Sequence, residues 1–278
     1  MLNCLAKACY FTKLNIVAVF NKIWVREEDE KYMTFHTQWE LFEYLIMLFG
    51  VKNESEIFQQ YINDMFHDFL DIFVTVYIDD ILIYLFMISE HQKHVQMILE
   101  QLRDAELQCD ILKCKFHISK VMYLSLIVSW NDIKMDLMKI DMIIGWESSW
   151  NIHDVWLFLE FANFYQWFIK NFLKIVWSLV NLTKKDTKFS WNMICEHVFN
   201  DLKKWFTTAL ILAHFDSDLE YVLEMNLSDH VQESVLLQYD KNGVLHPIAY
   251  FSRKLNAAES NYKIYNKKLL AIIQCFKQ

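Results

Sequence analysis

Residues 77–84, Tyr-Ile-Asp-Asp-Ile-Leu-Ile-Tyr, place two adjacent carboxylates, Asp79 and Asp80, between two largely apolar runs. β-Branched and aromatic residues dominate both runs, 71–76 and 81–84, so the pattern predicts two strands with the acids at the tight turn of a β-hairpin. Like charges side by side repel each other, and a divalent cation relieves that repulsion. The stretch is therefore a candidate phosphoryl-transfer site, although an ordinary exposed Asp-Asp turn explains these four residues equally well.

The composition is compatible with two domains or one large one. The 278 residues are 54% hydrophobic and 16% aromatic, which is rich for a soluble protein. The best candidate for a membrane span, residues 69–88, carries Asp71, Asp79 and Asp80, so we expect no transmembrane helix. The N-terminus lacks a basic segment followed by an apolar core, and the six cysteines lack zinc-finger spacing. We therefore expect an intracellular protein of the cytoplasm or nucleus, not a secreted one, with reduced thiols.

Three residue types are unusually scarce. The chain has 3 Gly and 1 Pro, whereas average usage is about 7% Gly and 5% Pro, and arginine is found only as Arg26, Arg103 and Arg253. There are 10 Trp, and the net charge of −8 argues against a strong nonspecific nucleic-acid binder. No folding requirement explains this combination, because an α/β chain needs Gly and Pro for its turns.

The apolar periodicity predicts both strands and helices. Residues 54–70 and 89–106 have the i, i+3/i+4 stripe of amphipathic helices, with Ser89 as the cap of the second. Two further helices are expected over residues 155–175 and 193–209. The inward-facing residues expected in the last of these are Val198, Leu202, Trp205 and Phe206. The other expected elements are strands within 14–20, 35–48, 116–128, 221–223, 235–238 and 247–251, and a helix that begins near 258.

Several short motifs follow one another along most of the chain. They are residues 42–50 (FEYLIMLFG), 77–84 (YIDDILIY), 113–116 (KCKF), 161–165 (FANFY), 182–185 (LTKK), 246–250 (HPIAY) and 252–255 (SRKL). The chain resembles the polymerase of gypsy-type LTR retrotransposons, collinearly across nearly all its length. The resemblance implies an α/β (α+β) fold in three parts. These are a reverse-transcriptase palm with residual fingers at 1–135, a mostly helical thumb or connection at 136–216, and the N-terminal part of an RNase H-like domain at 217–278.

The resemblance implies an RNA-directed DNA polymerase that acts by two-metal nucleotidyl transfer. Mg²⁺ or Mn²⁺ would be its cofactor, and an RNA/DNA template-primer and dNTP its partners. Asp79 takes the metal-bridging role and Asp80 a supporting one. The other implied site residues are Phe20, Gln59 and Lys113 at the nucleotide, and Tyr123, Leu124 and Ser125 as the primer grip.

Three catalytic positions of the family are changed in this chain. Asn15 stands where the first catalytic Asp is expected, so half of the metal cradle is missing. Asn226 and Lys268 stand where the RNase H domain has a catalytic Asp and Glu, and Ser125 and Glu233 stand at Gly positions. Each change can arise from one G:C to A:T transition, which also accounts for the scarce Gly, Pro and Arg. We hypothesise a mutationally degraded copy with impaired activity. The alternatives are a catalytically dead nucleic-acid-binding or interaction remnant and an untranslated relic.

Two histidines and one acid allow competing interpretations. His91 and His94 suggest a metal pair, but a solvated helix face is the commoner reason for this spacing. Glu160 replaces a Gly within an aromatic helix, where a buried unpaired carboxylate is costly. We therefore expect Glu160→Gly to stabilise the chain.

Tryptophans and lysines of residues 156–185 also allow two interpretations. Trp156, Trp167 and Trp177 could stack on bases, although tryptophans at helical spacing more often belong to a core. Lys184 and Lys185 could contact phosphate, and an ordinary solvated turn is at least as good an explanation. The sequence leaves both questions open.

Overall fold

The computed structural model describes most of the chain and divides it into two compact units. The described residues are 5, 8–17, 19–48, 50–130, 132–148, 151–185, 187–208, 212–216, 218–228, 231–240 and 242–275, with Val19 and Phe20 described by their backbone alone. Unit 1 comprises residues 1–124 with 128–130, and unit 2 comprises 125–127 with 131–278. The division into three parts at 135 and 216 stays a prediction.

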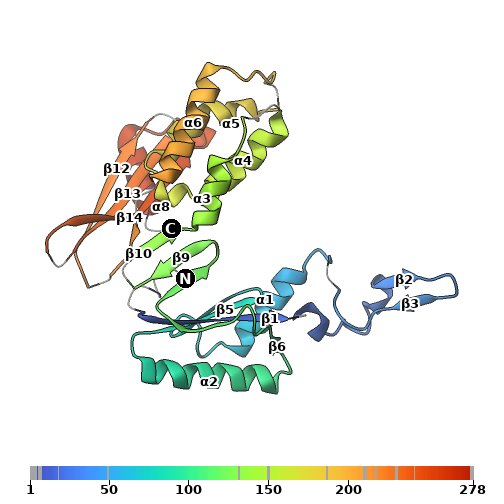
Figure 1. Ribbon diagram of the computed structural model, residues 1–278. Helices are drawn as coiled ribbons and strands as arrows, with labels where there is room; N and C mark the ends of the chain where they lie inside the picture. Colours follow the sequence, from blue (N-terminus) through green and yellow to red (C-terminus); the bar gives the residue numbers. More distant parts are fainter. Residues whose placement is uncertain are drawn as a thin grey trace. The chain divides into compact units, whose positions relative to one another are not determined.

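Unit 1 is built on an antiparallel sheet with the order β4-β5-β1-β6, and β7 pairs with β1 as well (Figure 1). Its strands are β1 (Tyr10–Val17), β4 (Val74–Tyr77), β5 (Asp80–Leu85), β6 (Gln108–Cys109) and β7 (Lys115–Ile118). The predicted hairpin is confirmed as β4 and β5, with its first strand beginning at Val74 and not at residue 71. The register sets Asn15 directly opposite Asp80, which brings two predicted site residues together.

Two helices share one hydrophobic core with this sheet. They are α1 (Glu54–Met65) and α2 (Ile88–Asp104). Phe58 and Ile62 of α1 and Ile98 of α2 are fully buried in the same cluster as Leu14 and Ile81. Both helices were predicted, but α1 ends five residues early. The cap of α2 is Met87, so the assignment of Ser89 as cap is wrong.

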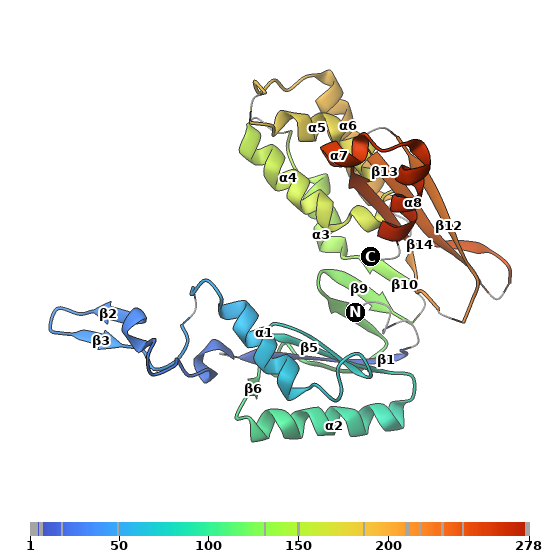
Figure 2. The same ribbon diagram turned by 180° about the vertical axis from the view of Figure 1, so that it is seen from behind.

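The remaining elements of unit 1 differ most from the sequence prediction. They are the 3-10 helices η2 (Val19–Lys22) and η3 (Glu30–Tyr32), the strands β2 (Thr34–His36) and β3 (Leu41–Glu43), and β8 (Lys120–Tyr123). The ribbon β2–β3 extends away from the rest of unit 1 in both views (Figures 1 and 2). All residues of both strands are exposed, so no hydrophobic core stabilises strands as long as those predicted within 35–48. Residues 116–128 form parts of three strands, the third being β9 (Leu126–Ser129), and not a pair.

Unit 2 begins with helices that carry many aromatic side chains. Its elements before the final sheet are β10 (Asp132–Met135), α3 (Leu137–Ile144), α4 (Ile152–Phe164), η4 (Gln166–Phe168), α5 (Phe172–Leu182), α6 (Met193–Thr207) and β11 (Leu212–Ala213). The expected helix over 155–175 is therefore interrupted, and Asn171 takes a left-handed φ of 60° just before α5. Asn tolerates that conformation, which explains how the chain turns there without Gly.

The aromatic residues of these helices are divided between core and surface. In α6 the buried residues are Cys195, Phe199, Leu202 and Phe206, so two of the predicted inward residues are confirmed. Val198 is partly buried, and the inward assignment of Trp205 is wrong. Trp205 is 48% exposed and Trp156 is 55% exposed. Trp167 is exposed as well, which overturns the core interpretation for these tryptophans. Glu160 is also exposed, so the expected stabilisation by Glu160→Gly loses its basis.

A three-stranded antiparallel sheet of order β12-β13-β14 completes unit 2. The elements are β12 (Tyr221–Leu227), β13 (Val231–Tyr239), β14 (Leu245–Lys254), α7 (Ala257–Ser260) and α8 (Ile264–Cys275). Gln232 donates to the Ala271 carbonyl of α8 at 2.9 Å, whereas Ser252 accepts from the Leu173 amide of α5 at 3.2 Å. Ser252 pairs with Glu233, the neighbour of Gln232, so α8 and α5 cover opposite faces of the sheet. Within this three-stranded sheet, β12 is an edge strand.

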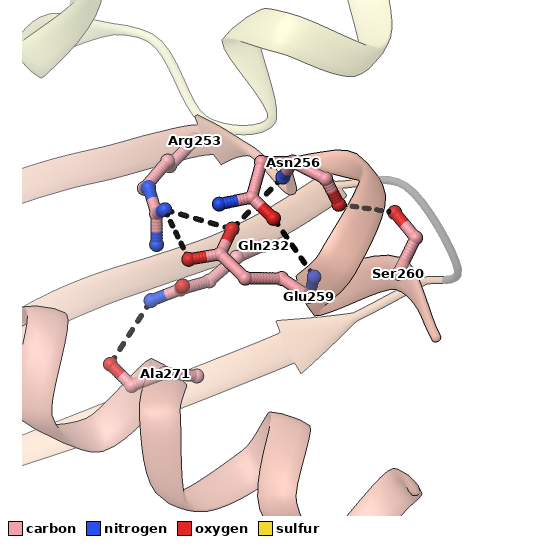
Figure 3. A network of polar contacts seen from close by, with 6 residues as sticks. All are labelled: Gln232, Arg253, Asn256, Glu259, Ser260 and Ala271. Atoms are coloured by element: carbon pink, nitrogen blue, oxygen red, sulfur yellow. Dashed lines mark hydrogen bonds and ion pairs between the residues drawn. The ribbon is translucent and has the colours of Figure 1, made fainter. Parts of the chain in front are cut away.

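A polar network fastens α7 to the end of β14 (Figure 3). Arg253 Nη2 donates to both carboxylate oxygens of Glu259, at 2.6 and 2.8 Å. Asn256 and Glu259 form a reciprocal capping box, with both bonds at 2.8 Å. The hydrogen bond from Arg253 and the Asn256 amide lower the pKa of the Glu259 carboxyl. One of the three arginines of the chain is thus used to hold the fold.

Candidate active site

The turn between β4 and β5 is held in a strained conformation by α1. Tyr77 pairs with Asp80, which leaves Ile78 and Asp79 as the two loop residues. Ile78 has φ of 51°, a conformation that costs a β-branched residue about 1–2 kcal/mol. Gln59 accepts from the Ile78 amide at 2.8 Å and donates to the Val76 carbonyl at 3.2 Å. The predicted nucleotide contact Gln59 therefore braces the hairpin that carries the acids.

Asp79 is the carboxylate with unused bonding capacity. Its Oδ1 is buried and has no hydrogen-bond partner among the described residues. Its backbone carbonyl accepts from the Ile16 amide at 2.8 Å, which fixes the residue against β1. Burial raises the pKa of the Asp79 carboxyl, the neighbouring Asp80 charge raises it further, and the nearby Lys113 ammonium lowers it. A buried carboxylate oxygen without a donor is a suitable ligand for a cation.

Asp80, in contrast, has both carboxylate oxygens engaged by β1. Lys13 Nζ lies 2.7 Å from Oδ2, and Asn15 Nδ2 donates to Oδ1 at 3.0 Å. Lys13 and Asn15 are two residues apart on one strand, so both side chains lie on the same face. A carboxylate at position 15 would accept and could not donate, so the amide gives Asp80 a bond that an aspartate could not supply.

The other predicted site residues have varied surroundings. Lys113 is exposed, with its ammonium 3.8 Å from Asp110 Oδ2, and its charge acts on Asp79. Tyr123 ends β8 fully buried, and burial raises the pKa of its phenol. Leu124 and Ser125 follow, with φ of 49° and 60°. Two successive residues in the left-handed region are typical of a type I′ turn, which favours Asn-Gly, so Leu-Ser is strained there. The Phe20 side chain lies outside the described residues.

A second group of predicted residues meets in unit 2. Asn226 of β12 and Lys268 of α8 line one cavity of about 390 Å³. The remaining lining residues are Met225, Leu227, Ile264 and Ala271. Among the residues that the structure describes, no carboxylate lines this cavity, so Asn226 and Lys268, the two predicted RNase H positions, meet there beside an ammonium group.

The donor sets decide which metal each site fits. Among the described residues, no group of three or more His, Cys, Asp or Glu side chains is placed to hold a metal ion. Asp79 offers one free oxygen to Mg²⁺, which commonly binds one or two carboxylates and keeps waters and phosphates as its other ligands. The hairpin therefore fits a single ion at Asp79, and the Lys268 cavity does not fit a cation.

His91 does not lie on a solvated helix face, as the spacing suggested. It is 0% exposed, and its Nε2 lies 2.9 Å from Thr12 Oγ1. Thr12 also accepts from the His117 amide at 3.1 Å, and the two imidazole rings lie 5.2 Å apart. Burial lowers the pKa of His91 to about 4, with smaller contributions from His117 and His94. His91 is a neutral core residue that ties α2 to β1.

Two family matches agree with this arrangement of the hairpin, β1 and α1. Residues 1–128 match the family described as reverse transcriptase (RNA-dependent DNA polymerase), and residues 191–278 match the RNase H-like domain found in reverse transcriptase. The chain thus contains a reverse-transcriptase domain and an RNase H-like domain of the kind found in reverse transcriptases. The resemblance drawn from the motifs is confirmed at this level.

Relatives and solved structures support the same conclusion. The Transposon Tf2-3 and Tf2-7 polyproteins of Schizosaccharomyces pombe are each 32% identical over 267 residues, which is 96% of this chain and 20% of each polyprotein. The chain thus spans about a fifth of the length of these relatives. The foamy viral protease-reverse transcriptase in complex with an RNA/DNA hybrid superposes with a TM-score of 0.82 at 19% identity, covering 99% of this chain and 38% of that one. Its complex with dsDNA gives 0.80 at 18% identity, covering 99% and 58%. The predicted mixed α/β fold is confirmed.

Sequence reasoning missed one residue of the candidate site, and the roles that it predicted for the others stay untested. Lys13 was not recognised as a site residue, although its place two residues before Asn15 on a strand puts it on the same face. The roles of Asp79, Asp80, Phe20, Gln59, Lys113 and the primer-grip residues stay predictions. No helix in the described part of the chain is long and apolar enough to cross a membrane.

Proposed function

We propose that the chain derives from an RNA-directed DNA polymerase whose nucleotidyl transfer is impaired in this degraded copy. The observation that carries the proposal is the unequal use of the two hairpin acids. Asp79 keeps a free buried oxygen, whereas Asp80 is bonded by Lys13 and Asn15. A two-metal centre needs carboxylates that bridge two ions, and this donor set supplies one free carboxylate.

The residues of the site have distinct tasks in this proposal. Asp79 would hold Mg²⁺ or Mn²⁺, which when bound activates the primer hydroxyl and neutralises charge on the nucleotide phosphates. Lys13 holds Asp80 against β1, and Gln59 keeps the turn in the conformation that presents Asp79. Lys113 adds positive charge near Asp79, where a dNTP phosphate would approach. An RNA/DNA template-primer is the proposed partner.

Primer extension tests the proposal. Wild-type chain and Asn15→Asp are compared on an RNA template with a DNA primer, in Mg²⁺ and in Mn²⁺. We expect no extension above background for the wild type and at least tenfold more for Asn15→Asp, because a second carboxylate then stands opposite Asp80 where the amide now donates to it. Asn53→Asp is the matched control, since it adds the same charge at the exposed N-cap of α1.

The outcomes separate the proposal from its competitors. Equal extension by wild type and Asn15→Asp would show that Asn15 is tolerated and that the polymerase is not impaired. Extension by Asn53→Asp as well would show that added charge alone is responsible. The double variant Asn15→Asp/Asp79→Asn must be inactive if Asp79 holds the cation.

The runner-up function is a catalytically dead nucleic-acid-binding remnant. It is favoured by the cavity in which Lys268 replaces an acid, because an ammonium there attracts phosphate instead of a metal ion. Binding of an RNA/DNA hybrid without extension by any of the revertants would support it over an impaired polymerase.

A further inference from the structure

The net charge of −8 hides a strong separation of charge along the chain. Residues 241–278 contain seven Lys or Arg and one acid, and residues 161–185 contain four Lys and no acid. Both segments belong to unit 2, where α5 lies against the sheet that ends in β14. An acidic total therefore does not exclude a locally basic surface, which is what governs contact with a polyanion.

One tryptophan brings the two basic segments together. The Lys184 ammonium, just beyond the end of α5, lies 5.4 Å from the centroid of the Trp177 ring. The Lys254 ammonium, at the end of β14, lies 5.3 Å from the same centroid. Both distances are within the range of cation–π attraction. We call these three residues the Trp177 patch.

The two ammonium groups of the Trp177 patch flank one ring and have no acidic partner among the described residues. They lie no more than 10.7 Å apart, because each is within 5.4 Å of one centroid. Neither forms an ion pair with a carboxylate of the described residues, and both lysine side chains are exposed. An anion that contacts both would therefore meet two positive charges that no described carboxylate neutralises.

We propose that the Trp177 patch is a docking site for the sugar-phosphate backbone of a nucleic-acid strand. Two exposed cations held beside an aromatic face are the combination that binds successive phosphates without reading bases. A polyanion engages both cations at once, and release of its counterions drives the association. The patch needs neither Asp79 nor a metal ion, so it retains nucleic acid even where nucleotidyl transfer is lost. This docking role rests on the proposed function, in which an RNA/DNA template-primer is the partner.

Fluorescence anisotropy with a labelled 20-base-pair RNA/DNA hybrid tests the patch, with EDTA present to exclude metal bridging. The decisive variant is Lys184→Ala/Lys254→Ala in the full chain, since both side chains are exposed and their loss leaves the core intact. We expect at least tenfold weaker binding at 0.1 M salt. We also expect the slope of log K against log salt to become shallower by about 2, one unit for each lost phosphate contact.

A matched variant controls for the change of net charge. Lys204→Ala/Lys263→Ala removes two exposed lysines of the same unit that do not contact Trp177, and we expect less than a threefold effect. Trp177→Leu should weaken binding by a smaller factor than the double lysine variant, because the lysines remain but lose their common support.

Two results would overturn the inference. Equal loss of binding in the patch and control variants would show that the total charge of the chain, and not the Trp177 patch, determines the affinity. Unchanged affinity and salt slope in Lys184→Ala/Lys254→Ala would show that the Trp177 patch does not bind nucleic acid. The proposed polymerase ancestry would be unaffected by that result. If the wild-type chain fails to bind the hybrid at all, the proposed partner is wrong and the patch falls with it.

Discussion

The carboxylate hairpin of unit 1 and the Arg253 network of unit 2 are both centred on acids, and their acids are treated in opposite ways. Glu259 has both oxygens bonded to Arg253, and its pKa is lowered. Asp79 has a buried oxygen that no described residue bonds, and burial raises the pKa of its carboxyl. An acid that holds a fold is fully bonded within the chain, whereas an acid that serves chemistry keeps capacity for an outside cation. The contrast supports the proposed cation-binding role of Asp79 without reference to any relative.

The largest expected effect concerns cation binding at the hairpin. We expect Asp79→Asn to weaken Mn²⁺ binding by a hundredfold or more, because it replaces the negative carboxylate with a neutral amide, which is a poor ligand for the cation. Asp80→Asn should change the affinity only a few-fold, since Lys13 and Asn15 already engage that carboxylate. Mn²⁺ titration followed by electron paramagnetic resonance measures both. Equal losses in the two variants would erase the distinction between the acids.

The Arg253 network should give the next largest effect. Glu259→Ala leaves the half-buried Arg253 guanidinium unpaired and opens the capping box with Asn256. We expect a loss of about 3 kcal/mol in the free energy of unfolding of unit 2. Urea titration followed by circular dichroism measures it. Glu220→Ala, which removes an exposed acid of the same unit, is the control and should cost less than about 0.5 kcal/mol.

Acid should destabilise unit 1 through His91. Its pKa is lowered from 6.5 to about 4, so the unfolded chain binds a proton at a pH where the folded chain does not. Stability is therefore fully present above about pH 6.5 and falls as the pH drops towards 4, by about 2 kcal/mol between pH 7 and 5. Burial also lowers the pKa of His94, so its protonation on unfolding adds to the same loss of stability in acid.

The pH effect is checked by urea midpoints from pH 7 to 5. His91→Gln keeps a polar side chain beside Thr12 but cannot take up a proton, so its stability should be lower at pH 7 and should vary less with pH. A variant with the same pH slope as the wild type would assign the acid sensitivity to other groups.

The smallest expected effect comes from the turn after β8. Ser125 has φ of 60°, where Gly is favoured, so Ser125→Gly should stabilise the chain by about 1 kcal/mol. Ser125→Ala is the control, because it shares the backbone strain and should not stabilise. A melting temperature that rises equally in both variants would show that the serine hydroxyl, and not the backbone conformation, limits stability.

Much of the fold followed from local patterns, because periodicity reports directly on burial. The hairpin, α1, α2 and α6 were predicted since each has an apolar face packed on a core. The break between α4 and α5 was missed because no Gly marks it. The residue with the left-handed φ there is Asn171. His91 was misplaced because a buried histidine and a solvated one have the same helical spacing. The bonding of Asp80 depends on the register of β1 with β5, which is a long-range property that no local pattern contains.

The edge strand β12 affects the solubility of the chain. β12 borders the three-stranded sheet, so one row of its backbone N–H and C=O groups has no neighbouring strand within that sheet. Such a border can recruit a strand from another molecule and so nucleate insoluble aggregates. Glu224 is exposed in the middle of β12 and is the only charged residue in that strand. Its charged side chain opposes such edge-to-edge pairing and is therefore a safeguard of solubility.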